Sequence, residues 1–283
     1  LAPGAELLMT KGIPCFTFPE LAVRALGGLV NYGRIRERPA KTPLPRYPEV
    51  EPEVVRQVFD RVREDRRRTL LGSEAIAVVA AYGIPVAPVR LARRPAEVVA
   101  YAEELGYPVV LKVASPEIIH KTDIGGVRVG LQTPEEVNEA FWEIMERVHE
   151  HLPRAVVHGV EVQKMCPRGT ELIVGVTRDI QFGPLIAFGL GGIYVNLLKD
   201  AAFRLVWGID EQQVEEMIKE TKAYTLLRGY RGEKPRDTSA LVNIISRVAC
   251  LVNDFPEIVE MDLNPVFAYE KGAVALDVKI TIK

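Results

Sequence analysis

The sequence predicts an α/β protein, and three observations lead to this prediction. A chain of 283 residues, of which 48% are hydrophobic, is long enough to bury a large core in two or three folding units. Between residues 84 and 151, short apolar runs alternate with longer stretches of helical period. Glycines and prolines stand at the ends of these runs, where turns and helix starts are expected. Such alternation of strands and helices is typical of the α/β class.

The first 38 residues predict a fragment of an α/β domain. A short strand at Ile13–Phe16 precedes a helix that Pro19 opens, with apolar residues at helical spacing: Leu21, Val23, Leu26, Leu29 and Val30. Because this piece is too small to bury itself, we expect it to be the C-terminal edge of a domain whose earlier part precedes Leu1. Residues 39–52 carry five prolines and predict a semi-rigid linker, which places a domain boundary there.

The main domain is expected over residues 53–283, with a first subdomain at about 53–155. A charged helix should run from Pro52 to about Thr69, and Ser73 is expected to cap a second helix that Gly83 ends. Strands are then predicted at 84–86, 108–113 and 127–131, and helices at 95–106 and 134–151.

The second subdomain, at about 156–283, should contain closely spaced strands at 156–165, 171–177 and 183–188 and helices at 211–222 and 238–254. It should end in a hairpin of residues 259–269 and 273–282, with a two-residue turn at Lys271-Gly272 that sets Asn264 opposite Lys279. Strand alternation then puts four polar residues on one face: Asp262, Asn264, Asp277 and Lys279. Their oxygen ligands suit Mg²⁺ bound with phosphates; a solvated sheet face is the alternative.

Charge and cysteine content exclude several classes. A net charge of -2 and an isoelectric point near 6.2 predict no nucleic-acid partner and no membrane surface. The longest apolar stretch, residues 184–198, is too short for a membrane span. Three distant cysteines, Cys15, Cys166 and Cys250, argue against a disulfide framework and a zinc site, so we expect a reducing compartment, the cytoplasm.

Residues 109–130 hold the first group of candidate site residues. Lys112 ends an apolar strand and could hold phosphate oxygens, although a lysine snorkelling at a strand end is the alternative. Gly125 and Gly126 could bring backbone N–H groups to a phosphate, or could simply form a hairpin turn. His120, in a polar loop, could act as acid, base or phosphoryl acceptor, or could be a surface histidine.

A second group lies on the strand that runs into Cys166-Pro167. Its extended edge could offer backbone groups to an adenine at Glu161, Gln163 and Lys164, and the Glu171 carboxylate could then bind ribose hydroxyls. A strand, a turn and a second strand without a ligand would give the same pattern.

Together these motifs resemble the ATP-grasp domain of ADP-forming acyl-CoA synthetases (acetate–CoA ligases) and, more distantly, the β subunit of succinyl-CoA synthetase. The resemblance covers residues 51–283 and is carried by six segments: Tyr82 to Val86, Gly106 to Lys112, Ser115 to Val127, Phe188 to Gly192, Leu198 to Leu205, and Asp262 to Pro265. It implies an ATP-grasp fold, preceded in residues 1–38 by the edge of a flavodoxin-like CoA-ligase domain.

The resemblance also implies roles for individual residues. Lys112 would contact the nucleotide phosphates, Glu161 the adenine, and Glu171 the ribose and phosphates. Asn264 and Asp277, with Asp262 beside them, would bind Mg²⁺. His120 would take a phosphoryl group from a histidine in the CoA-ligase part and pass it to ADP.

The implied reaction is acyl-CoA + ADP + phosphate to free acid + ATP + CoA, reversibly. The expected partners are CoA-ligase domains in the same or another chain, in an oligomer. Two alternatives stay open: a carboxylate ligase that makes an acyl phosphate directly in the nucleotide site, and a nucleotide- or acyl-CoA-sensing module of a larger protein.

Overall fold

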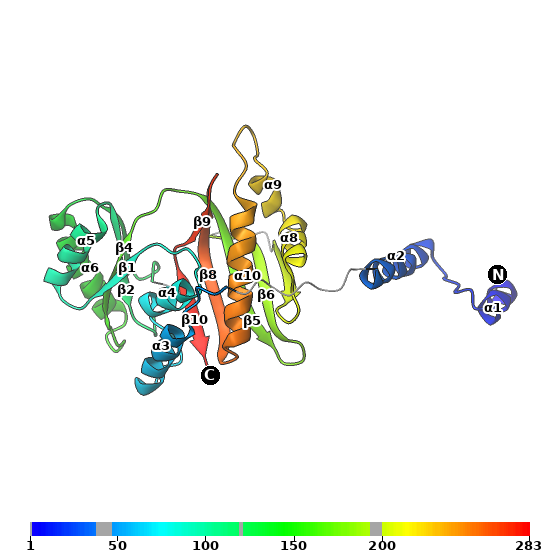
Figure 1. Ribbon diagram of the computed structural model, residues 1–283, viewed down its shortest axis with the longest axis horizontal. Helices are drawn as coiled ribbons and strands as arrows, with labels where there is room; N and C mark the ends of the chain where they lie inside the picture. The colour runs from blue at the N-terminus through cyan, green and yellow to red at the C-terminus, as the bar shows by residue number, and fades with distance from the viewer. Residues whose placement is uncertain (1, 38–46, 119–120, 193–199) are drawn as a thin grey trace. The chain divides into compact units, whose positions relative to one another are not determined.

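The computed structural model describes residues 2–37, 47–118, 121–192 and 200–283 (Figure 1). Contacts divide the chain into two units, Leu1–Thr42 and Pro43–Lys283. The predicted linker, residues 39–52, spans this division, and its first eight residues lie outside the described ranges.

The first unit contains two helices, α1 (Ala2–Thr10) and α2 (Pro19–Arg36). Pro19 opens α2 as predicted, because its missing N–H is not needed in the first turn. The large apolar side chains of α2 are exposed within the described part of this unit, and none of its residues is buried there. The predicted strand at Ile13–Phe16 is wrong: these residues form no strand, since a strand needs a partner and the described residues of the unit offer none.

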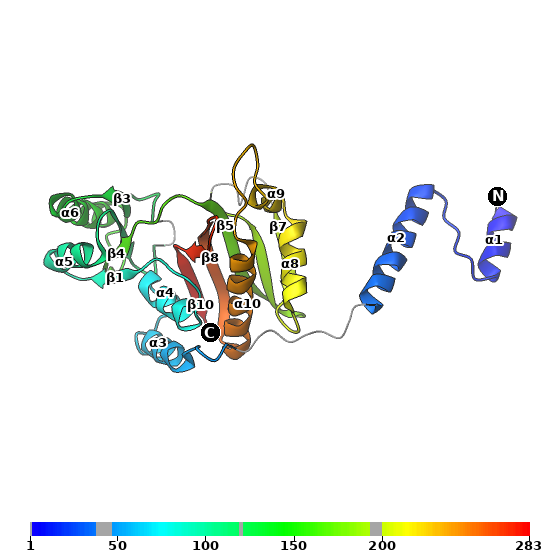
Figure 2. The same cartoon turned by 45° about the horizontal axis from the view of Figure 1, so that its top comes forward.

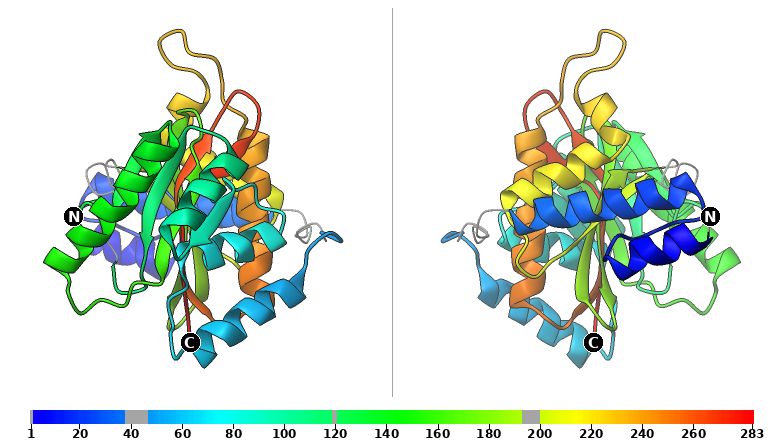
Figure 3. Two further views of the ribbon diagram at one scale, coloured as in Figure 1. Left: turned by 90° about the vertical axis from the view of Figure 1, so that its left-hand side faces the viewer. Right: turned by 90° about the vertical axis from the view of Figure 1, so that its right-hand side faces the viewer.

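The second unit is built on two antiparallel sheets. The smaller has four strands in the order β1-β4-β2-β3: β1 (Val89–Ala92), β4 (Gly159–Lys164), β2 (Val109–Ala114) and β3 (Val127–Leu131). Helices α5 (Pro95–Leu105) and α6 (Pro134–His151) cover one of its faces, as the left view of Figure 3 shows. Thr133 caps α6 by accepting a hydrogen bond from the Glu136 amide at 3.2 Å.

The larger sheet has the order β10-β8-β5-β6-β7, with β9 also paired to β8. Its strands are β5 (Thr170–Asp179), β6 (Gly183–Leu190), β7 (Ala201–Leu205), β8 (Ile258–Ala268), β9 (Ala273–Ala275) and β10 (Val278–Ile282). Two helices, α8 (Glu211–Glu220) and α10 (Thr238–Asp254), pack side by side on one face of this sheet, with the short α9 (Ala223–Leu227) next to α8 (Figure 2).

Two buried clusters of hydrophobic residues hold these layers together. One cluster joins the small sheet to α5 and α6. The other joins the large sheet and its helices to α3 (Pro52–Glu64) and α4 (Gly72–Ala81). Relative to the predicted boundary at residues 155/156, β4 lies after it and belongs to the small sheet, while α3 and α4 lie before it and pack on the large sheet. Antiparallel pairing of distant segments decided this, and such pairing leaves no local signal in the sequence.

Helix α4 begins differently from the prediction. Leu71, not Ser73, occupies the cap position, and its N–H donates to the Glu74 carboxylate at 2.8 Å. Arg67 binds both oxygens of Glu74, at 2.8 Å each, and so ties the preceding loop to the first turn of the helix. Ser73 lies inside that first turn, where its backbone N–H is free to bind another carboxylate.

Candidate functional site

One face of the small sheet carries three of the predicted site residues. Lys112 on β2 pairs in register with Glu161 on β4, and Val110 pairs with Gln163. Because side chains alternate along a strand, Lys112, Glu161 and Gln163 share the face turned away from α5 and α6. The opposite face is apolar and packs against those helices. Alternation therefore presents three polar side chains from adjacent strands on one surface.

Lys112 and Gln163 meet the C-terminal hairpin at a single carbonyl group. Lys112 Nζ donates to the Leu276 carbonyl oxygen at 3.3 Å, and Gln163 Nε2 donates to the same oxygen at 2.8 Å. Asp277 Oδ1 lies 3.8 Å from Lys112 Nζ, with its side chain 42% exposed. The predicted phosphate lysine and a predicted metal ligand, 165 residues apart in sequence, are thus neighbours.

The hairpin keeps the predicted face but not the predicted register. Lys279 pairs with Asp262 rather than with Asn264, whose backbone N–H donates to the Asp277 carbonyl at 3.1 Å. The turn is centred one residue earlier than predicted, and Tyr269 N–H donates to the Gly272 carbonyl at 3.0 Å. Moving a turn by one residue moves the register by two, so the alternation is preserved. Asp262, Asn264 and Asp277 consequently remain on one side.

A glycine turn after β6 completes this corner. Gly191 N–H donates to the Glu171 backbone carbonyl at 3.0 Å, and Gly192 N–H donates to Asn264 Oδ1 at 3.2 Å. Gly192 has a φ of +61°, and an added Cβ there would overlap the Glu171 carboxylate. The turn thus brings Glu171, on β5, toward Asn264, on β8. The sequence marks this segment only as a break in a strand.

The acidic residues of the hairpin fit a divalent cation. Asp262 Oδ1 is buried without a hydrogen-bond partner, and burial raises the pKa of this carboxyl to about 6, against the opposing effect of Lys279. A bound cation would satisfy such an orphaned oxygen. Within the described ranges no three His, Cys, Asp or Glu residues cluster closely enough for a metal ion. A cation here would depend on two carboxylates, the Asn264 amide and oxygens of a bound nucleotide.

Gly125 and Gly126 form a turn of the protein, which is the alternative that the sequence left open beside a phosphate loop. Their N–H groups donate to the carbonyls of Thr122, at 3.0 Å, and of Lys121, at 2.7 Å. A Cβ on Gly126 would lie 2.7 Å from a methyl group of Val113. The amides are therefore already used, and the glycines are needed because the turn packs closely against β2.

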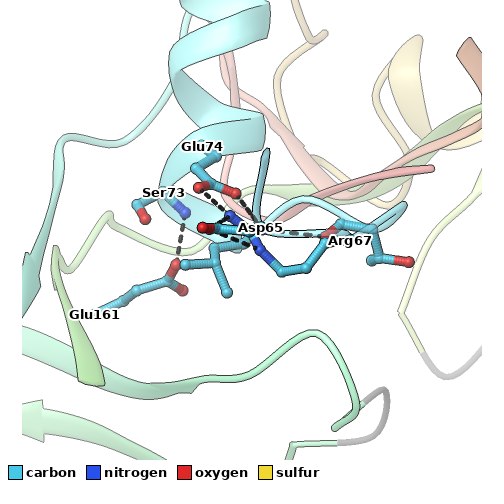
Figure 4. Close-up of polar contacts among 7 residues, drawn as sticks. Asp65, Arg67, Ser73, Glu74 and Glu161 are labelled. Atoms are coloured by element: carbon cyan, nitrogen blue, oxygen red, sulfur yellow. Dashed lines mark hydrogen bonds and ion pairs between the residues drawn. The ribbon is translucent and has the colours of Figure 1, made fainter. Parts of the chain in front are cut away.

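Glu161 has a different environment from the adenine site predicted for it. Its side chain is only 2% exposed, and Oε1 accepts a hydrogen bond of 2.5 Å from the Ser73 N–H in the first turn of α4 (Figure 4). Its other oxygen lies 3.5 Å from Lys121 Nζ. Gly72 permits the approach, since a Cβ there would lie 2.6 Å from Glu161 Oε2. Both oxygens of the carboxylate are engaged inside the protein.

Lys164 is also engaged inside the protein, by the segment between α5 and β2. Its ammonium group donates to the carbonyls of Gly106, at 2.5 Å, and of Tyr107, at 3.0 Å. Any contact of this strand with an adenine would therefore use backbone groups, as the sequence suggested. His120, the predicted phosphoryl carrier, lies outside the described residues, while Lys121, the next residue, lies within them.

A family model described as an ATP-grasp domain matches residues 61–282. The chain therefore belongs to the ATP-grasp domain family. Its relatives include the β subunit of the ADP-forming acetate–CoA ligase I of Pyrococcus furiosus, which is 45% identical over 80% of this chain and 97% of that subunit. The ADP-forming acetate–CoA ligase I of Archaeoglobus fulgidus is 44% identical over 98% of this chain. The chain spans 40% of the length of that longer ligase.

Solved structures give the same family likeness. Acetyl-coenzyme A synthetase 1 of Ca. Korarchaeum cryptofilum, in complex with coenzyme A, Ca-AMPCP and HgCl+, matches with a TM-score of 0.78 and 45% identity, over 81% of this chain and 99% of that chain. A second structure of that protein, with coenzyme A and Mg-AMPPCP, has a phosphohistidine segment pointing towards the nucleotide binding site. It matches with a TM-score of 0.72 and 43% identity, over 81% of this chain and all of that one.

No helix in residues 2–37, 47–118, 121–192 and 200–283 is long and apolar enough to cross a membrane.

Proposed function

We propose that this chain is the nucleotide-binding part of an ADP-forming acyl-CoA synthetase. The whole enzyme converts acyl-CoA, ADP and phosphate to the free acid, ATP and CoA, and the reaction is reversible. Support comes from relatives that are ADP-forming acetate–CoA ligases, one of them a β subunit matched over 97% of its length. Further support comes from the nucleotide and coenzyme A complexes of the Korarchaeum synthetase.

One observation carries the proposal: Lys112 of the small sheet and Asp277 of the hairpin converge, 3.8 Å apart, on one side of the domain. A cationic nitrogen beside a half-exposed carboxylate offers one group to phosphate oxygens and another to the cation that accompanies them. The Leu276 carbonyl accepts hydrogen bonds from Lys112 on β2 and from Gln163 on β4. The distance between Lys112 and Asp277 is therefore set by this backbone group as well as by their own side chains.

Each residue then has a stated task in nucleotide binding. Lys112 contacts the phosphate oxygens, and Glu171, placed by the Gly191-Gly192 turn, contacts the ribose or the phosphates. Asn264, Asp277 and Asp262 provide oxygen ligands for Mg²⁺. When bound, Mg²⁺ neutralises part of the negative charge on the phosphates. Lys112 adds to that neutralisation where charge develops during phosphoryl transfer.

The phosphoryl group reaches the nucleotide through histidines. In the CoA-ligase part, phosphate displaces CoA from the acyl group, and the acyl phosphate then transfers its phosphoryl group to a histidine, which releases the acid. The phosphoryl group passes to His120 and then to the terminal oxygen of ADP, which yields ATP and restores the imidazole. Histidine carriers are required because the acyl-CoA and nucleotide sites lie on different domains. The partner is therefore a CoA-ligase domain, in the same or another chain.

Labelled phosphate tests this proposal directly. The full-length enzyme is incubated with γ-labelled ATP and Mg²⁺, and label that is labile in acid but stable in base is measured on the ATP-grasp part. His120→Ala should remove that label and abolish acid formation coupled to ADP. His120→Ala with full activity and no labelled histidine would overturn the carrier role, and would favour a ligase that forms an acyl phosphate directly in the nucleotide site.

A further inference from the structure

Glu161 is a buried charge whose two carboxylate oxygens are both engaged inside the protein. Only 2% of its side chain is exposed, and it lies on β4 directly beside Lys112 in the strand register. A carboxylate this deeply buried is costly unless opposite charge and hydrogen bonds compensate it. Two groups do so: the backbone N–H of Ser73, at the positive end of the α4 dipole, and the ammonium group of Lys121.

The first of these compensating groups is fixed. The ion pair of Arg67 and Glu74 fastens the first turn of α4, which contains Ser73, to the loop before it (Figure 4). Gly72 has no side chain to keep the carboxylate away. The position of Glu161 is thus set by the helix, whether or not Lys121 is present.

The second group belongs to the segment that bears the predicted phosphoryl carrier. Lys121 follows His120 in the sequence, and its carbonyl accepts the Gly126 N–H at 2.7 Å. The Gly126 carbonyl in turn accepts the Val113 N–H at 2.8 Å, one residue beyond Lys112 on β2. Residues 121–126 are therefore attached at two points: by backbone to β2, and by the Lys121 side chain to Glu161.

We infer that Glu161 is a positioning residue for phosphoryl transfer. By holding the Lys121 ammonium group at the N-terminus of α4, it fixes the residue that follows His120 in the sequence. This inference rests on the proposed function, because it assigns Glu161 a task only if His120 carries a phosphoryl group. Because both oxygens of Glu161 are engaged inside the protein, it acts through Lys121 and not directly on the transferred group.

Two substitutions isolate the charge pair. Glu161→Gln keeps an oxygen for the Ser73 N–H but removes the negative charge that faces Lys121. Lys121→Met removes the positive charge and leaves the Glu161–Ser73 bond intact, so it remains informative if the first variant folds poorly. Lys219→Met is the matched control, because Lys219 forms an ion pair with Glu215 at 2.8 Å on the exposed surface of α8.

The readout is the single-turnover rate of phosphoryl transfer from labelled ATP to His120 in the full-length enzyme, measured together with the Kd for Mg-ATP. Each single variant should slow transfer by about tenfold, a size typical of misplaced but intact catalytic groups. The double variant should be no slower than either single one, since both remove the same interaction. The Kd should stay within about twofold of wild type, and Lys219→Met should transfer at the wild-type rate.

Three results would overturn the inference: a wild-type transfer rate in Glu161→Gln and Lys121→Met, additive losses in the double variant, or a Kd for Mg-ATP that rises in step with the loss of rate. The last would mean that Glu161 supports nucleotide binding instead. Failure of the proposed function is distinguishable, because in that case the wild-type enzyme would carry no label on His120, or His120→Ala would keep the label or full activity, whatever the behaviour of Glu161.

Discussion

Replacing Lys112 by Met should impair nucleotide binding while leaving the folded protein nearly as stable as before. Met has a similar length but no charge. The Leu276 carbonyl would keep its hydrogen bond from Gln163 at 2.8 Å, and Asp277 is 42% exposed, so water can replace the lost ammonium group. Since the pair is separated by 3.8 Å and partly hydrated, its loss should cost about 0–1 kcal/mol of unfolding free energy.

The loss in binding should be larger. A lysine about 4 Å from a phosphate charge gains about 4 kcal/mol at an effective dielectric constant of about 20. Lys112 is only 13% exposed, so it loses little further hydration when the nucleotide binds. The phosphate does lose water, and this cost should leave about half of the Coulomb energy as a gain in binding. A loss of about 2 kcal/mol corresponds to a Kd for Mg-ATP raised about 30-fold.

Isothermal titration calorimetry with Mg-ATP, together with urea unfolding, separates the two effects. Lys164→Met is an informative contrast, because Lys164 donates to two carbonyls of the segment between α5 and β2 and its loss should reduce stability more than affinity. A Kd for Lys112→Met within threefold of wild type would refute the reasoning. So would a loss of several kcal/mol in unfolding free energy, since Lys112 would then be a structural lysine.

Three further outcomes are expected. Gly192→Ala should raise the Kd for Mg-ATP with a smaller effect on folding, because its Cβ would displace the Glu171 carboxylate and strain a backbone with φ of +61°; an unchanged Kd would separate Glu171 from the site. Arg67→Met should lower the unfolding free energy by about 3 kcal/mol in urea titrations, since Arg67 and Glu74 are only 9% and 22% exposed, and a loss below about 1 kcal/mol would contradict this. Chelation of Mg²⁺ should weaken ATP binding in the wild type but change little in Asp277→Asn, whereas an equal effect in both would remove Asp277 from the metal site.

Helix α2 was predicted correctly from local sequence, although its large apolar side chains are exposed within the described part of the first unit. Pro19 and the spacing of the leucines predicted this helix, and it forms over Pro19–Arg36. The apolar residues form a stripe along one side of the helix, and any surface that packs on α2 would have to be apolar along that stripe.

Several features of this protein were determined by local sequence. The helices that begin at Pro95 and Pro134, and the strand that ends near Lys112, formed where proline placement and periodicity predicted them. The predicted polar face of the terminal hairpin is also observed, although the strand register differs from the prediction by two residues. A turn that moves by one residue changes the pairing by two, so the same residues stay on one face. Motifs in separated segments were sufficient to indicate the ATP-grasp family, which the match over residues 61–282 shows.

The tertiary structure alone decided which distant groups meet. Nothing in the sequence indicates that Lys112 and Gln163 share the Leu276 carbonyl, since backbone groups look alike in every residue. Glu161 suggested an adenine contact from its place on a strand, but the approach of α4 buried it against Ser73 and Lys121. Packing of the hairpin and of α4 against the small sheet produced both results. Strand composition indicates which residues will form a strand, whereas the choice of partner depends on the packing of the whole domain.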